Sequence, residues 1–161
     1  MLIQIMDMGP DVKGDCSLPG FQNKIELLAY SHGVAMQITG DISSRERVSG
    51  KPNHVDMSVT KHLDAASPVL NQACCEGKSF PKVDIIVGSD DGGKMVELMR
   101  YTISNVIISS ISVSGGGGDK PVENVTLNYN KIIWRYTPQK PVAGEAKAIE
   151  GTWDLAKNAA K

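Results

Sequence analysis

Residues 55–87 read VDMSVTKHLDAASPVLNQACCEGKSFPKVDIIV and decide the fold of the chain. Residues 55–61 alternate between apolar and polar side chains, which is the period of a half-buried strand. Residues 83–87 form a short apolar run of strand length. The residues between them have the composition of a helix. This stretch therefore predicts a strand, a short helix and a second strand.

The helix carries start and stop signals at both ends. Ser67 stands where a side-chain oxygen can cap the first turn, and Pro68 follows at the first helical position. Gly77 stands where a helix closes in the left-handed conformation. These signals predict a helix over about 65–76, too short to be stable unless it packs on a sheet. The expected packing residues are Leu63, Leu70, Ala73 and Cys74.

The rest of the chain is rich in strands. Further strands are expected over 2–6, 24–29, 34–38, 95–113, 122–136 and 151–155, the fourth of them bending near Ser104-Asn105. Glycine-containing turns are expected at 88–93 and 114–119, and a long polar loop at 40–53. We predict a single domain, 1–161, of mainly β structure: an antiparallel β-barrel of two packed sheets with long hairpin loops, one opening being covered by the short helix.

Composition restricts the class of protein. The 161 residues carry a net charge of −1 with both signs interspersed, which argues against nucleic acid as a partner. No apolar run is long enough to insert into a membrane. The first residues lack the basic and apolar regions of a signal peptide, so synthesis in the cytoplasm is expected. Three cysteines do not make a disulfide framework.

No motif in the sequence supports catalysis, a metal site or a cofactor. Cys74 and Cys75 are adjacent on the predicted helix and point about 100° apart, so they are interpreted as small, unreactive helix residues. His54 and His62 are too far apart along a strand to bind one metal, and solvated or capping roles are expected. The glycine run at 115–118 lacks the lysine of a phosphate-binding loop. The sequence therefore indicates a protein that is not an enzyme.

Many short motifs follow one another along the chain in a recognisable order. The helix region contributes Thr60-Lys61, Asp64, Ala66-Ser67-Pro68, Leu70, Ala73-Cys74 and Gly77-Lys78. Motifs outside it include Val12-Lys13-Gly14, Ala29-Tyr30-Ser31-His32-Gly33, Val106-Ile107-Ile108-Ser109-Ser110, Glu123-Asn124-Val125-Thr126-Leu127-Asn128 and Trp153-Asp154. In this order they resemble one family, the haemolysin-coregulated proteins (Hcp), which form the tube of bacterial type VI secretion. The sequence departs from the family at His32, where members often carry an aromatic residue, and at 43–47, where they carry a glycine-rich loop.

The resemblance implies a homohexameric ring and a tube of stacked rings. It further implies partners in the sheath, spike and baseplate, small effector proteins in the lumen, and secretion through the type VI apparatus after synthesis in the cytoplasm. A ring requires two different surfaces on each subunit. The predicted strand over 24–29 carries apolar residues on both faces, which fits that requirement.

Two sites follow from these considerations. Ser31 is a small polar residue on the strand that approaches the lumen wall in the family, so we expect it to contact effectors. Arg45, Glu46 and Arg47 place both signs of charge in the middle of the long loop, so we expect this loop to join stacked rings. Such contacts should weaken as salt rises.

Two alternatives remain open from the sequence alone. The chain could be a monomeric barrel that binds a small ligand in its interior. It could also be a hydrolase whose site is assembled from distant residues, namely His54, His62, Asp56 and Asp64. A mass near six protomers in solution would separate the ring from both.

Overall fold

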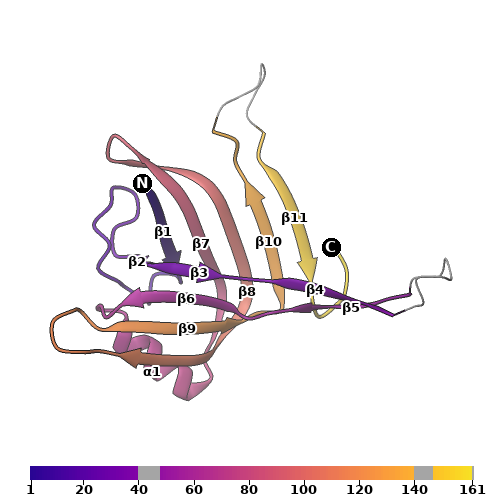
Figure 1. The fold of residues 1–161 in the computed structure, drawn as a ribbon, viewed down its shortest axis with the longest axis horizontal. Coiled ribbons are helices and arrows are strands. Elements are labelled where there is room, and N and C mark those ends of the chain that lie inside the picture. The colour runs from indigo at the N-terminus through magenta and orange to yellow at the C-terminus, as the bar shows by residue number, and fades with distance from the viewer. Residues whose placement is uncertain (40–47, 140–146, 161) are drawn as a thin grey trace.

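The computed structural model describes residues 1–39, 48–139 and 147–160, shown as a ribbon in Figure 1. Within this part of the chain there are eleven strands and one helix. In order they are β1 (Leu2–Asp7), β2 (Ile25–Glu26), β3 (Ala29–Ser31), β4 (Val34–Thr39), β5 (Val48–His54), β6 (Met57–His62), α1 (Ser67–Glu76), β7 (Ser79–Asp91), β8 (Lys94–Ser114), β9 (Val122–Asn128), β10 (Lys131–Tyr136) and β11 (Ile149–Asp154).

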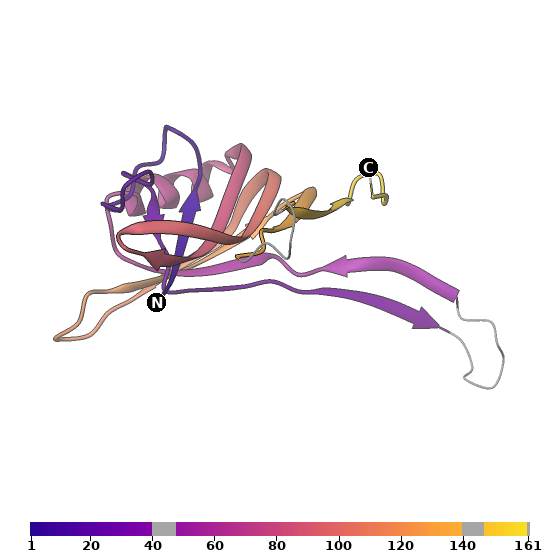
Figure 2. The same ribbon diagram turned by 90° about the horizontal axis from the view of Figure 1, so that it is seen from above.

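Nine of these strands form one antiparallel sheet. Seven follow the order β2-β1-β7-β8-β9-β6-β3, while β10 pairs with β8 and β11 pairs with β10. The remaining pair, β4 and β5, makes a separate two-stranded sheet that extends away from the body (Figure 2). The predicted mainly β antiparallel fold with one short helix is confirmed.

The two ends of the strand order are joined by the chain itself. β2 and β3 are consecutive, and Leu27 and Leu28 lie between them. The Leu27 N–H donates to the Gln4 carbonyl of β1 (2.9 Å), and the Leu28 N–H donates to the Thr60 carbonyl of β6 (2.7 Å). No ladder connects β2 with β3 in the described residues, so the sheet is strongly curved and is not closed as a barrel.

Strand β8 is long enough to belong to two halves of the sheet. Its residues up to Ser104 pair with β10, and its residues from Ile107 onward pair with β9. Between them Asn105 adopts φ +50°, a left-handed conformation that asparagine tolerates better than most residues. The bend that was predicted at this position is confirmed.

The predicted strand over 24–29 is wrong as one element, because β2 and β3 are separated at Leu27 and Leu28. Three further boundaries differ from the sequence prediction. The part of the 40–53 loop from Val48 onward is strand β5, and residues 40–47 lie outside the described residues. The segment 122–136 is two strands, because the Asn130 N–H leaves the ladder and donates to the Ser104 carbonyl (3.2 Å). The turn at 88–93 reduces to Gly92-Gly93, whose φ angles of +62° and +85° suit a tight hairpin.

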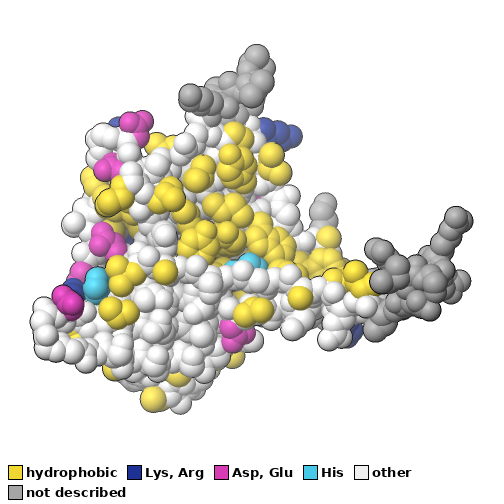
Figure 3. Space-filling model, in the orientation of Figure 1, with side chains coloured by type: hydrophobic (Ala, Val, Ile, Leu, Met, Phe, Trp, Pro, Cys, Tyr) yellow, Lys and Arg dark blue, Asp and Glu magenta, His cyan; other side chains and the backbone are white. Residues whose placement is uncertain are grey.

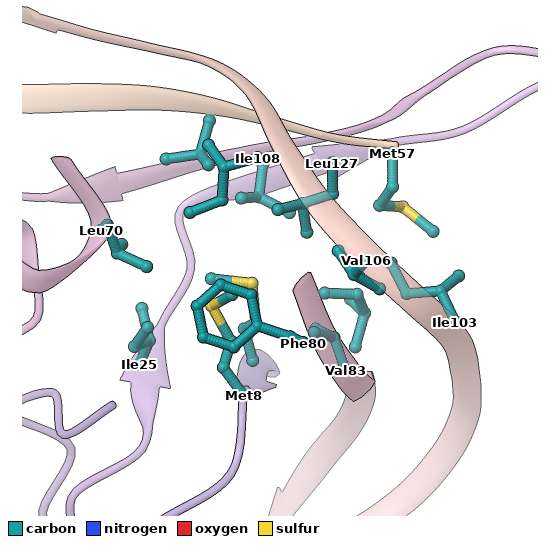
Figure 4. Close-up of a cluster of buried hydrophobic side chains, with 14 of the residues drawn as sticks. Met8, Ile25, Met57, Leu70, Phe80, Val83, Ile103, Val106, Ile108 and Leu127 are labelled. Atoms are coloured by element: carbon teal, nitrogen blue, oxygen red, sulfur yellow. The ribbon is translucent and has the colours of Figure 1, made fainter. Parts of the chain in front are cut away.

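The core lies between the concave side of the sheet and α1. Figure 4 shows apolar side chains from the helix and from strands far apart in sequence meeting there. Leu70 and Ala73 of α1 are buried in this core and Cys74 is partly buried against it, as predicted. Leu63 is 39% exposed, so its predicted contact is wrong: it lies just beyond the end of β6, outside the packed region.

The start of α1 differs from the prediction, although its end agrees with it. Ser67 makes no capping bond. Its hydroxyl instead donates to Glu123 Oε2 (2.7 Å) and accepts from Lys61 Nζ (3.1 Å). Lys61 is fully buried and also pairs with Glu123 (2.6 Å) and Asp64 (2.8 Å). At the other end Gly77 is left-handed (φ +61°), and this prediction is confirmed.

Candidate functional site

The β4–β5 hairpin exposes apolar side chains although it lies away from the core. Val34, Met36 and Ile38 on β4 are 47%, 45% and 60% exposed. Their spacing of two residues is that of one strand face, with a bulge between Met36 and Ile38. A two-stranded hairpin is only marginally stable by itself in water. The hairpin therefore has the character of a segment that packs against another surface.

A second apolar surface lies where β8, β10 and β11 pair. Tyr136 is opposite Met99 on one side and opposite Ile149 on the other, and Trp134 is opposite Tyr101. Tyr136 is 44% exposed and Ile149 is 65% exposed. Figure 3 shows a continuous patch of hydrophobic atoms across this face of the molecule. We refer to these five residues as the β10 face.

A histidine and aromatic cluster connects the hairpin to the β10 face. His32 and His54, which flank the hairpin, have ring centres 6.3 Å apart and lie 6.0 and 6.2 Å from the ring of Trp134. The Nδ1 atoms of both histidines lie 3.3 Å from the hydroxyl of Tyr129. The structure thus contradicts the solvated or capping role expected for His54: its ring packs among aromatic side chains.

Burial controls the titration of this cluster. Desolvation lowers the pKa of His32, and the neighbouring His54 lowers it further. Desolvation also lowers the pKa of His54. It raises the pKa of Tyr129, and it raises the pKa of Tyr101 to about 12. Both tyrosines are therefore neutral hydroxyls, and both imidazoles favour the uncharged form.

Ser31 lies on a different surface, the convex side of the sheet. It is exposed and pairs with Ser58 in β6. Two rows of short side chains cross this side from β3 to β8: Ser31, Ser58, Thr126 and Ser110, and next to them Ala29, Thr60, Asn124 and Ser112. None of these eight residues is charged, and we refer to them as the polar face.

Four of the side chains on the polar face bond one another in pairs. Thr126 bonds the hydroxyl of Ser110 (2.5 Å) and Thr60 donates to Asn124 (2.9 Å). Asp56 at its border accepts bonds from Ser109 (2.7 Å) and from Asn128. Such a surface offers weak hydrogen bonds and no charge to a molecule that passes over it.

The residues suggested for a hydrolytic site are not brought together. His54 belongs to the aromatic cluster, while Asp56 bonds Ser109. His62 and Asp64 line a separate cavity of about 140 Å³ together with Cys16. No group of three or more metal-ligating side chains fit to hold an ion is found in the described residues. Helices among those residues include none of a length and hydrophobicity that would span a membrane.

The remaining expectations concern the charged loop residues and the cysteines. Arg45, Glu46 and Arg47 lie outside the described residues. Cys16, Cys74 and Cys75 are all free, and Cys75 is exposed on α1. The cluster of His32, His54 and Tyr129 was not foreseen.

Comparison with known proteins identifies the family. The model of a family described as "Type VI secretion system effector, Hcp" matches residues 3–136. Protein hcp1 of Pseudomonas aeruginosa is 33% identical over 150 residues, which is 92% of each chain. The chain belongs to the Hcp family. This family consists of structural, secreted tube proteins of type VI secretion and is not known for enzymatic activity.

Solved Hcp-family structures have the same fold. A type six secretion system protein superposes with a TM-score of 0.90 at 26% identity, covering 100% of both chains. Hcp1 from Salmonella typhimurium superposes with a TM-score of 0.79 at 21% identity, covering 98% of this chain and 97% of the other. The curved sheet, α1 and the extended hairpin therefore belong to a fold already observed in this family.

Proposed function

We propose that this Hcp-family chain is a tube subunit that assembles into six-membered rings. The observation that carries this proposal is the presence of two different apolar surfaces on one subunit, the β4–β5 hairpin and the β10 face. Exposed apolar patches of this kind mark protein–protein contacts. Two different surfaces that fit each other make a head-to-tail contact, which closes into a ring when the rotation allows it.

In this proposal the hairpin of one subunit covers the β10 face of the next. The hairpin carries Met36 and Ile38 far from its own core, and the β10 face presents Tyr136 and Ile149 to solvent. Burying such side chains contributes about 1.5–3 kcal/mol for each that is fully covered. When six copies close into a ring, every hairpin covers a β10 face and neither surface is left exposed.

The polar face supplies a suitable lining for the lumen. Its uncharged, mutually bonded side chains would let small effector proteins pass while offering weak contacts near Ser31. Arg45, Glu46 and Arg47 are proposed to join stacked rings through contacts of opposite charge. The tube would then act with the sheath, spike and baseplate, after synthesis in the cytoplasm, and leave the cell through that apparatus.

Light scattering coupled to size-exclusion chromatography tests the assembly. Six copies of the 17.3 kDa chain have a mass of about 104 kDa. A Met36→Asp variant places a charge on the apolar side of the hairpin and should shift the mass toward one subunit. Leu2→Asp is a matched control, because Leu2 is 60% exposed and lies outside both surfaces. A wild-type mass near 17 kDa would instead favour the monomeric ligand-binding barrel.

A further inference from the structure

The two histidines of the aromatic cluster stand at the neck of the β4–β5 hairpin. His32 lies two residues before the first strand of the hairpin, and His54 is the last residue of the second. The Val55 N–H donates to the Gly33 carbonyl (2.9 Å), which closes the neck on the side of the backbone. The rings of His32 and His54 have centres 6.3 Å apart, so a movement of the neck changes the surroundings of both.

Tyr129 joins the two histidines through one hydroxyl. Its oxygen lies 3.3 Å from both Nδ1 atoms, and its proton points to the Val55 carbonyl (3.4 Å). A hydroxyl has one proton and two lone pairs, so it can donate to Val55 and accept from both imidazoles. The three contacts are satisfied together when each histidine is a neutral ring with a protonated Nδ1.

Protonation of His32 would place a proton on a buried nitrogen that has no hydrogen-bond acceptor near it. The Nε2 atom of His32 is buried and has no hydrogen-bond partner among the described residues. As a lone pair it is tolerated, but an added proton would create a buried N–H without a partner, and such groups are destabilising. The second histidine at 6.3 Å would add repulsion if it were also charged.

The Val55 carbonyl favours the charged form of His32, but the other surroundings offer little compensation for a positive charge. The cluster is faced by Tyr30 and Tyr101, whose hydroxyls lie 3.5 Å apart, by Tyr129 and by Trp134. Aromatic faces attract cations, but this stabilises only part of a buried charge. The nearest influential carboxylate is Asp56, which acts on Tyr129 and is held by Ser109 and Asn128. No carboxylate bonds either imidazole in the described part of the chain.

We propose that His32, His54 and Tyr129 form a proton-sensitive clamp that fixes the direction of the β4–β5 hairpin in neutral solution and releases it in acid. In the open state both imidazoles reach water and gain protons at their ordinary pKa, near 6.5. In the closed state their pKa values are lowered by burial. The open state therefore binds more protons, so the closed state loses stability as pH falls below about 6.5.

The third histidine of the chain provides a matched control. His62 is exposed at the end of β6 and lines a cavity remote from the cluster. With only three histidines, the imidazole carbon-bound protons of ¹³C-histidine-labelled protein can be assigned with single variants and titrated by NMR. We expect His32 and His54 to titrate below the ordinary imidazole value of about 6.5. Titration of both at or above that value would overturn the proposal.

Hydrogen exchange reports on the hairpin itself. Amide protection in 34–39 and 48–54, corrected for the intrinsic rate, should fall roughly tenfold between pH 7.5 and 5.0 for each unit of pKa difference. A His32→Phe/His54→Phe variant keeps aromatic rings without titration and should lose this response, whereas His62→Phe should keep it. If the double variant responds to acid like wild type, the clamp is refuted.

A milder variant covers the case in which the double variant fails to fold. His54→Gln retains a polar group at the neck and removes one titrating ring, so it should reduce the acid response of the hairpin and raise the pKa of His32. An unchanged His32 titration would contradict the coupling. The histidine titration is read within one subunit. Hydrogen exchange of the hairpin also depends on the ring contact of the proposed function, so it is compared only between samples of the same mass by light scattering, and the two proposals can fail separately.

Discussion

The buried network around Lys61 yields a stability prediction with a defined size. Lys61 is fully buried, and its Nζ contacts Glu123 (2.6 Å), Asp64 (2.8 Å) and the hydroxyl of Ser67 (3.1 Å). These contacts join β6, β9 and the start of α1. Lys61→Met retains most of the side-chain volume but leaves two carboxylates, 1% and 8% exposed, without their cation.

Breaking a buried ion pair by removing one partner destabilises a protein by about 3–5 kcal/mol, because the remaining charge is uncompensated. For a chain of this length, 1 kcal/mol corresponds to roughly 2–4 °C in Tm. The variant should therefore melt roughly 6–20 °C below wild type. Adding Glu123→Leu removes one of the stranded charges, so the double variant should be less destabilised than the sum of the two single changes.

The assay is thermal and urea unfolding followed by circular dichroism, with all variants at one protein concentration because assembly would add to apparent stability. Lys82→Met is the matched control. Lys82 is 61% exposed and pairs with Asp84 (3.1 Å), which keeps Arg100 as a partner. An exposed pair is worth about 0–1 kcal/mol. If Lys61→Met changed stability no more than Lys82→Met, the reasoning about the buried network would be refuted.

Three further predictions concern the assembled protein. Ser31→Gln should keep the hexamer mass but crowd the polar face, so at least one effector should stop co-purifying; unchanged co-purification of every effector would remove Ser31 from the proposed lumen site. Arg45→Glu with Arg47→Glu should keep the hexamer mass but abolish tube formation and secretion, and normal secretion would make the loop a mere connector. A Cys16/Cys74/Cys75→Ser variant should remain a hexamer with or without reductant, and dissociation of wild-type rings by mild reductant alone would contradict this.

The sequence predicted those elements whose signals are local. Pro68 and Gly77 mark the ends of α1 within a few residues, and Asn105 marks the bend of β8. Ser67 was misread because the partner of its hydroxyl, Glu123, is 56 residues away. A local pattern cannot distinguish a cap from such a bond.

Strand β5 and the histidine cluster were missed for one shared reason. Gly50 and Pro52 weaken the strand signal of 48–54, because glycine lacks a side chain to pack and proline lacks an N–H. Without β5, nothing in the sequence brings His54 next to His32. A prediction of the hairpin would have placed His54 opposite Val34 and so brought it near His32 at the neck.

Cross-linking tests the central claim, the head-to-tail ring, most directly. In the background of the three cysteine-to-serine changes, Met36→Cys places one thiol on the hairpin and Tyr136→Cys places another on the β10 face of the same chain. Treatment with a short bis-maleimide, followed by denaturing electrophoresis, counts the subunits that are linked. A head-to-tail ring of six subunits gives a ladder of bands that ends at six, with no ladder when either cysteine is omitted. A ladder that ends at two, or no intermolecular product at all, would contradict it.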